Sequence, residues 1–435
     1  MKKAARVFTD RDTRNLILDI LYLASFAALF FRMFISSTKW QITFPENYNT
    51  VFLYAAGISG GLRILSRRNF RIFTVLFMAF VCFSFSKSWL AFPDDRILMA
   101  AVLIPAAYGI NYKYILKTVL LISVPVIAVT VVCSRLGFVE EIIYYRGSKI
   151  RMCLGFAYPT NFASHVFFTC VSWMLVREKK AGFIDAGVFA VIAFCLYRFC
   201  DARCSTISLS MLTLIVIFFR VRTIMCRRKG NDYTPGKAVF IVCIVIPLVM
   251  CASALLLAYF YDSSIPWMAK LNSILSDRIR LGNEAFRDYY VNAFGQFVRM
   301  YDQILAAQLN VEYFFLDSSY IWNLFKYGVC GLISAVGMYE FMIVKNRRNA
   351  WIMAAAALIS IHSFVEHHMI RFDYCPIVIM AFASFEGEGS FIKDFKGMHE
   401  RLTAPEPEKK KKGNGSRSGG KKKSGKKSGK KSKKR

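Results

Sequence analysis

Apolar residues in this chain come in long runs that are separated by short polar stretches. A helix of ~20 apolar residues crosses the hydrocarbon layer of a bilayer with all of its backbone groups hydrogen-bonded internally. The pattern therefore predicts an all-α, polytopic integral membrane protein with about 12 transmembrane helices. The predicted spans are 15–35, 46–65, 71–88, 97–111, 115–136, 159–177, 182–199, 204–222, 237–260, 318–342, 349–367 and 371–387, of which the fourth and the twelfth are the shortest.

Positive charge alternates between the loops that join these runs. Lys and Arg cluster at 2–14, 63–71, 113–117, 179, 220–229 and 345–348. Short loops rich in Lys and Arg stay cytoplasmic. With twelve spans all of these clusters fall on one side, so we expect both termini to be cytoplasmic and the loops 136–158 and 261–317 to lie outside. The first run has no small-residue cleavage site and is expected to remain as a signal anchor.

The last part of the chain differs in composition from the rest. Residues 409–435 consist mainly of Lys and Arg interleaved with Gly and Ser, in a chain whose formal net charge is +30. We predict a membrane domain over 1–387 and a disordered polybasic cytoplasmic tail over 388–435. The expected partners of this tail are anionic lipid headgroups, and a tail that is only solvated is the alternative. It has no interleaved aromatic residues for base stacking, so no nucleic acid is expected.

Motifs of nucleotide-using and hydrolytic soluble enzymes are missing from the sequence. It has no phosphate loop, no GxGxxG, no HExxH and no GxSxG, so ATP-driven work is not encoded. Most of the 12 cysteines lie inside apolar runs, where Cys behaves as a small hydrophobe. Cys200 and Cys204 flank an outer loop, where a disulfide is an alternative to free thiols. Chemistry is therefore expected at the outer face.

The first outer loop leads directly into the sixth predicted span. Pro159 suits the first turn of a helix, and Tyr158, Asn161 and His165 then follow at i, i+3 and i+7 along one face. A polar stripe within a span normally faces the bundle interior or a watery cavity. For His165, a packing histidine that is bonded to a neighbouring helix is the alternative.

The second outer loop carries the spacing of short helices. Trp267, Met268, Leu271 and Leu275 keep a helical period, and Asn283 is expected to cap a second helix. Such helices are expected to lie on the membrane surface. Both outer loops supply arginines, whose planar side chains bind phosphate with paired hydrogen bonds: Arg146, Arg151, Arg278, Arg280, Arg287 and Arg299.

A third polar cluster follows the eleventh predicted span and contains Glu366, His367, His368, Arg371 and Asp373. Adjacent histidines on a helix point in different directions, so no metal site is expected. A carboxylate or imidazole beside an arginine is suited to positioning or deprotonating an acceptor hydroxyl.

Four segments, taken together and in order, resemble the O-antigen polymerase and ligase superfamily, in particular Wzy-type polysaccharide polymerases. They are RMCLGFAYPTN (151–161), SILSDRIRLGNEAF (273–286) with Gly295 after it, LDSSYIWNLFKYG (316–328) and EHHMIRFDYCP (366–376). The resemblance covers roughly 140–380. The chain departs from the family pattern at Tyr158, where many relatives have His, at Thr160, and at Asp373 or Tyr374, where Asn is common.

The resemblance implies an enzyme of bacterial capsule or exopolysaccharide synthesis in the cytoplasmic membrane. It would join oligosaccharide repeat units carried on a polyprenyl diphosphate, with no cofactor and no metal. Arg151 and Arg278, with Arg146, Arg280 and Arg287, would hold the diphosphate, while Glu366 or His367 would act near the acceptor. Expected partners are the lipid-linked glycan, a chain-length regulator and a flippase. A ligase-like glycan transferase, a lipid-linked oligosaccharide flippase or transporter, and a noncatalytic scaffold are the alternatives.

Overall fold

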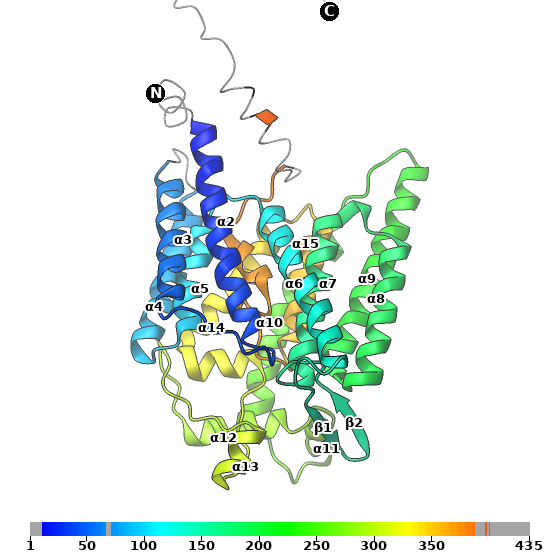
Figure 1. Cartoon of the computed structure of the whole chain (residues 1–435). Coiled ribbons are helices and arrows are strands. Elements are labelled where there is room, and N and C mark those ends of the chain that lie inside the picture. Colours follow the sequence, from blue (N-terminus) through cyan, green and yellow to red (C-terminus); the bar gives the residue numbers. More distant parts are fainter. Residues whose placement is uncertain (1–10, 67–70, 388–395, 398–399, 401–435) are drawn as a thin grey trace, which may run out of the picture.

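The chain folds into a bundle of helices with a layer of short elements at one end (Figure 1). The structure, a computed structural model, describes residues 11–66, 71–387, 396–397 and 400. The bundle contains α2 (Arg11–Ile35), α3 (Tyr48–Leu65), α4 (Ile72–Ala91), α5 (Asp95–Ala106), α6 (Tyr112–Arg135), α7 (Pro159–Arg177), α8 (Phe183–Cys195), α9 (Arg203–Arg228), α10 (Lys237–Tyr259), α14 (Ser319–Lys345) and α15 (Ala350–His362). The short elements are β1 (Ile143–Arg146), β2 (Lys149–Met152), α11 (Pro266–Ile274), α12 (Arg278–Asp288), α13 (Gln303–Leu309), the 3₁₀ helices η1 (Glu178–Lys180) and η3 (Pro376–Phe382), and the π-turn η2 (Leu196–Cys200).

Seven of the described helices are long and apolar enough to cross a membrane. They are α2, α4, α6, α8 with η2, α9, α10 and α14. Each of the first eleven predicted spans overlaps one α-helix, with ends that differ by several residues, whereas the twelfth overlaps the 3₁₀ helix η3. The helical membrane architecture is thus confirmed, while the number of 12 crossings and the cytoplasmic location of the termini stay predictions. The predicted tail, 388–435, lies almost entirely outside the described residues.

The two predicted outer loops lie together at one end of the bundle. Figure 1 shows β1, β2, α11, α12 and α13 at its lower end, although they come from loops far apart in sequence. At the opposite end, the Glu178 carboxylate joins three helices. It accepts hydrogen bonds from Tyr112 Oη and Asn349 Nδ2, both at 2.6 Å, and pairs with Lys113 Nζ at 2.8 Å.

A β-hairpin in the first outer loop was not predicted from the sequence. Strands β1 and β2 pair antiparallel, with Tyr144 opposite Arg151 and Arg146 opposite Lys149. Four residues a strand are too few for a clear alternation of apolar and polar positions. In the structure β2 also packs against η2, a long-range contact that a local sequence pattern does not show.

In the second outer loop, the sequence correctly predicted a helix where α11 lies, but it placed the start of α12 too late in the chain. Asn283 does not cap a helix, because α12 begins at Arg278, after Asp277 in the left-handed conformation (φ 63°). The Asn283 side chain instead donates to the Ala258 carbonyl at the end of α10, at 2.9 Å. Asn283 therefore connects α12 to α10 by a hydrogen bond and does not act as a helix cap.

Helix α14 is broken at Gly328, where φ is 77° and ψ is −179°. The outer-loop segment 292–296 fills the break: Val329 N donates to Asn292 O (2.9 Å) and Cys330 N donates to Ala293 O (3.0 Å). Gly328 and Gly295, which also has a positive φ of 88°, lie in this contact, because a Cβ at either position would overlap the opposing backbone. The second outer loop is therefore built into the bundle.

The last two apolar elements are too short to cross a bilayer by themselves. Helix α15 has 13 residues, about 20 Å at 1.5 Å a residue, and η3 has 7 residues. Nearly all of their side chains are buried. Irregular backbone is tolerated at membrane depth where protein covers it, so the segment 363–375 between them forms a loop inside the molecule.

Candidate functional site

The hairpin arginines are held against the turn between α8 and α9. Arg151 Nε donates to the Cys200 carbonyl at 3.0 Å, and Arg146 Nη1 lies 3.2 Å from Asp201 Oδ2. Asp201 is nearly buried, has a left-handed backbone (φ 44°), and also attracts Lys149 at 3.6 Å and Arg203 at 3.8 Å. Asp201 was not singled out in the sequence, and it fixes the position of the hairpin.

Arg278 is the first residue of α12, and it reaches the buried loop after α15. Its Nε donates to Val365 O at 2.7 Å, and its Nη2 lies 3.4 Å from Glu366 Oε1. Asp317 Oδ2 lies 3.5 Å from Nε. The side chains of Arg278 and Glu366 are 15% and 4% exposed, so this is an ion-paired group shielded from solvent.

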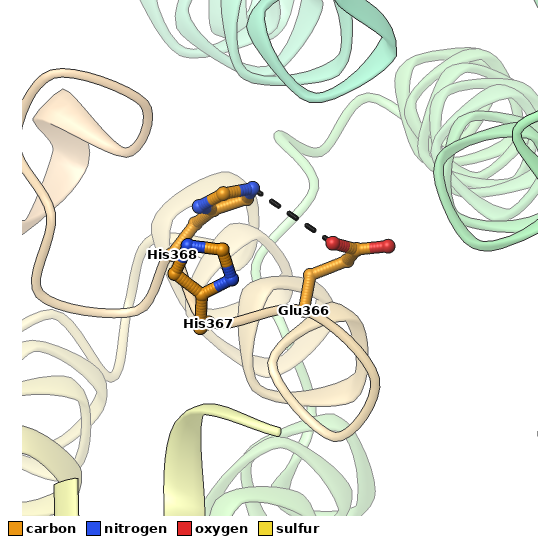
Figure 2. Close-up of side chains that lie close together, drawn as sticks. All are labelled: Glu366, His367 and His368. Atoms are coloured by element: carbon orange, nitrogen blue, oxygen red, sulfur yellow. Dashed lines mark ion pairs between the residues drawn. The ribbon is translucent and has the colours of Figure 1, made fainter. Parts of the chain in front are cut away.

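Glu366, His367 and His368 lie close together on this loop (Figure 2). Glu366 Oε2 and His368 Nε2 are 3.8 Å apart. Arg371 Nη1 lies 3.2 Å from His367 Nε2, and since a guanidinium can only donate, Nε2 is the acceptor. The proton of a neutral His367 is therefore on Nδ1, which makes Glu366 the better proton acceptor of the two candidates.

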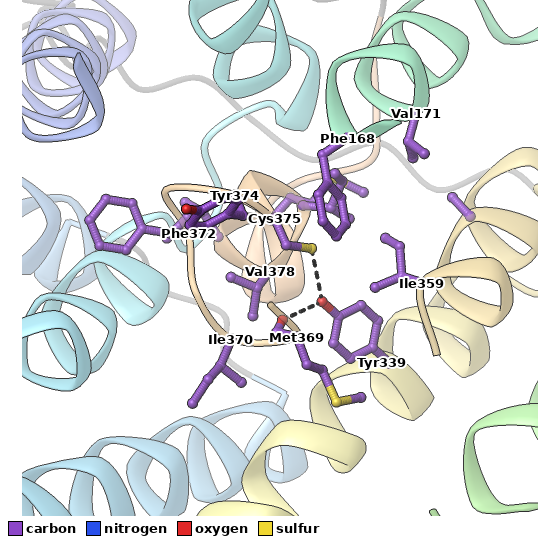
Figure 3. Packing of buried hydrophobic residues seen from close by; sticks show 14 of the residues in the cluster. Phe168, Val171, Tyr339, Ile359, Met369, Ile370, Phe372, Tyr374, Cys375 and Val378 are labelled. Carbon is purple, nitrogen blue, oxygen red and sulfur yellow. Dashed lines mark hydrogen bonds between the residues drawn. The ribbon is translucent and has the colours of Figure 1, made fainter. Parts of the chain in front are cut away.

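The loop is fixed by bonds to the first residue of α14, Ser319, and to the core around Tyr339. Ser319 Oγ donates to Glu366 O at 2.5 Å and accepts from Met369 N at 3.1 Å. Tyr339 Oη donates to Met369 O at 2.7 Å and contacts Cys375 Sγ at 3.2 Å (Figure 3). The Glu366 carboxylate is thus held on a rigid support, as a preorganised site requires.

Electrostatics connects both outer loops with Glu366. Burial raises the pKa of Glu366 above its ordinary value. The positive charges of Arg278, Arg151 and Arg146 oppose this effect and make the rise smaller. Burial lowers the pKa of Arg151, as does the nearby charge of Arg146. Burial also acts to lower the pKa of Arg278, but Asp317 and Glu366 outweigh it and raise that pKa. Three arginines from two separate loops therefore act on one buried carboxylate.

The Glu366–His367–His368 group also has the composition of a metal site, with possible ligand atoms within 4.8 Å of one another. The prediction of no metal site assumed that both histidines lie on a helix. That assumption is wrong, because His367 and His368 lie on a loop. Another argument stands against a metal. Arg371 and Arg278 contact this group, and His367 Nδ1 carries the proton where a ligand lone pair would be needed.

The polar stripe of α7 is partly as predicted. Pro159 is the first residue of the helix. His165 is buried, hydrogen-bonds through Nε2 to Ser37 Oγ at 2.8 Å, and stacks on Tyr374 with centroids 4.1 Å apart. Tyr158 stacks on Tyr144 of β1 at 5.3 Å, and burial raises its pKa. Asn161 is half-buried one turn into the helix.

The remaining predicted arginines lie apart from this group. Arg280 pairs with Glu284 on the same helix and with Glu312, and Arg287 is exposed. Arg299 is exposed and lies 5.6 Å from the centre of the Tyr301 ring. Of the predicted arginines, Arg278 contacts Glu366 directly, at 3.4 Å, whereas Arg146 and Arg151 are bonded to Asp201 and Cys200 and act on Glu366 through their charge.

A second buried charged group lies beside His367 and was not predicted. Lys326 Nζ of α14 contacts Asp94 Oδ2 at 2.6 Å and lies 4.5 Å from the Trp322 ring centre. Trp322 stacks on His367 with centroids 4.8 Å apart. Its Nε1 and both side-chain polar atoms of Asn323 are buried with no hydrogen-bond partner in the described part of the chain. These groups extend the polar interior next to the carboxylate.

Comparisons with family models, with curated proteins and with solved structures found no match.

Proposed function

We propose that the protein is a polysaccharide polymerase that joins lipid-diphosphate-linked oligosaccharide units at the outer face of a bacterial cytoplasmic membrane. The observation that carries the proposal is the contact of Arg278 with the buried carboxylate of Glu366, at 3.4 Å, to which Arg146 and Arg151 of the hairpin add positive charge. Arg278, which is shielded from water, suits a charged phosphate leaving group, and the carboxylate beside it suits an acceptor hydroxyl.

The reaction follows from this arrangement. The acceptor hydroxyl oxygen attacks the anomeric carbon of the donor sugar and forms the new glycosidic bond. The bond between that carbon and the phosphate oxygen breaks, and the lipid diphosphate leaves with the electron pair. Glu366 takes the hydroxyl proton. Arg151 and Arg278 stabilise the negative charge that develops on the leaving oxygen, so this step uses side chains of the protein alone.

A ligase-like transferase would use the same donor chemistry with a different acceptor. The Lys326, Asp94 and Asn323 group next to His367 provides donors and acceptors for sugar hydroxyls. A polymerase extends glycan that is still attached to lipid diphosphate, whereas a ligase leaves that glycan at one length and moves it elsewhere. The size of the lipid-linked glycan therefore separates the two activities.

The test replaces Arg151 or Arg278 by lysine. Each substitution keeps the charge and loses the planar paired donors, so the rate should fall ~10²- to 10³-fold, as when one charge-stabilising donor is removed from other enzymes. Cells should then accumulate single lipid-linked repeat units. The measurement is the length distribution of lipid-linked glycan in cells that express each variant at matched levels.

Arg299→Lys is the matched control, because Arg299 is exposed and apart from Glu366. It should leave the length distribution unchanged. Normal long chains from both Arg151→Lys and Arg278→Lys would refute the proposed site.

A further inference from the structure

A cavity of about 110 Å³ lies at the end of the bundle opposite to the outer loops. It is formed by η1, the end of α9, the segment 229–236 and the start of α15, which are far apart in sequence. Three cationic side chains line it: Lys179, Arg227 and Arg348. This end carries the clusters of Lys and Arg that are expected to be cytoplasmic. The proposed reaction, which takes place at the other end, does not use this cavity.

Two carboxylates also line the cavity, but they do not pair with its arginines. Glu178 is occupied by three side chains of the bundle, as its hydrogen bonds and ion pair show, and is only 15% exposed. Asp232 lies 3.8 Å from Lys179 Nζ, and both of these side chains are exposed. Arg227 and Arg348 have no ion-pair partner among the residues that the structure describes. Two guanidinium groups are therefore left to bind an anion from outside the chain.

The walls of the cavity limit the size of that anion. Trp351 is buried and packs edge-on against Phe219, with ring centres 5.0 Å apart, and the Tyr233 ring centre lies 6.0 Å from the same phenylalanine. These rings form a fixed wall. A volume of about 110 Å³ corresponds to several water molecules, so it accommodates a phosphate group but not a whole nucleotide. Phosphate is also the anion that guanidinium groups bind with paired hydrogen bonds.

We infer that this cavity is a binding site for a phosphate group, which Arg227 and Arg348 hold with Lys179 beside them. Its location favours the headgroup of a membrane lipid. The helices next to it present exposed apolar side chains such as Met225 of α9 and Ile241 of α10, and the lipid headgroups lie where these helices end. A soluble phosphate offers the same chemistry. The inference is independent of the proposed function, because it involves no residue near Glu366.

Binding to the purified full-length protein in detergent micelles tests this site. One probe is phosphatidic acid, whose headgroup is a single phosphate, measured by native mass spectrometry. The other is radiolabelled inorganic phosphate, measured by equilibrium dialysis. The double variant Arg227→Gln, Arg348→Gln should bind the phosphate probe about tenfold or more weakly than the parent, because two charge-assisted contacts are lost.

The matched control is the double variant Arg228→Gln, Arg347→Gln. It removes the same charge from the same two segments, but these arginines do not line the cavity, so binding should stay close to that of the parent. Both variants keep the basic segment 409–435, so any anion that this segment binds contributes equally to the comparison.

The two probes distinguish the sources of the phosphate. A specific loss with phosphatidic acid alone supports a lipid headgroup, and a specific loss with inorganic phosphate supports a soluble phosphate. Equal binding by the parent and the Arg227→Gln, Arg348→Gln variant would overturn the inference. Equal losses in the two double variants would also overturn it, because net charge alone would then explain the binding.

Discussion

Replacement of Gly328 by alanine should detach the second outer loop from α14. Gly328 has φ 77° and ψ −179°, a conformation that residues with a Cβ rarely adopt. A Cβ there would overlap Ala293 O, Phe294 N and Gly295 N, all of them backbone atoms that cannot rotate away. The loop segment 292–296 must therefore move, and its bonds to Val329 N and Cys330 N are lost.

The expected cost follows from these two effects. The disfavoured backbone conformation costs ~1–3 kcal/mol. Loss of the two hydrogen bonds from Val329 N and Cys330 N adds ~1 kcal/mol each. The sum, about 3–5 kcal/mol, is a large part of the ~5–15 kcal/mol that stabilises a typical folded domain. Local release of the loop avoids most of this strain, so we expect the loop to open before the bundle unfolds.

Limited proteolysis of the purified protein measures this opening. Gly328→Ala should be cut within 289–300 many times faster than the parent protein, while cleavage at the opposite end of the bundle stays the same. Gly187→Ala is the matched control, because Gly187 lies within α8 with no other atom within 4 Å of its expected Cβ. That change should be neutral or stabilise by up to ~1 kcal/mol. Equal cleavage of Gly328→Ala and parent would refute the role of the inserted loop.

Two further predictions concern carboxylates. Burial raises the pKa of Glu366, and a proton acceptor works only when ionised, so turnover should fall with decreasing pH well above the ~4.3 of an ordinary Glu. Initial rates against pH should show this acid limb in the parent, and Glu366→Gln should be inactive at every pH; an active variant with the same limb would contradict the assignment. Asp201→Asn should weaken the attachment of the hairpin by ~1–3 kcal/mol, because it removes the buried charge that pairs with Arg146 and Lys149. The cost is not larger, since both partners are partly exposed and screened by solvent. Proteolysis within 143–152 should then accelerate, and a cleavage rate equal to that of the parent would contradict this role.

The sequence predicted the helices better than it predicted the elements between them. Long apolar runs identify α2 or α10 because a lipid-facing helix must be apolar along its whole length. The same rule fails for 349–387, where apolar residues fill a protein interior. The run there is divided between α15, a loop and η3. Length and composition cannot distinguish these two environments, since both exclude water.

The candidate site shows the same limit in its local geometry. Residue type was enough to single out Arg151, Arg278 and Glu366, because charged groups next to apolar runs are costly and so occur mainly where they have a function. Their partners Asp201 and Asp317 were missed, because each comes near its arginine only through long-range packing. His367 and His368 were assigned to a helix, on which they would diverge. In the observed loop their rings lie 4.4 Å apart.

The ion pairs of the site suggest how donor binding and proton transfer are linked in the proposed reaction. Arg278 already faces two carboxylates, Glu366 and Asp317. Arg151 Nε donates to the neutral Cys200 carbonyl, and its Nη2 has no hydrogen-bond partner among the described residues. An incoming diphosphate would therefore meet Arg151 without displacing a carboxylate, and would then compete with Glu366 for Arg278. As Arg278 turns to the phosphate, Glu366 loses the charge that lowers its pKa and becomes more basic. Only an ionised carboxylate can take the hydroxyl proton, so this gain in proton affinity aids the reaction only above the raised pKa. The acid limb of the turnover profile should therefore lie at higher pH when the donor is bound than when Arg278 faces Glu366.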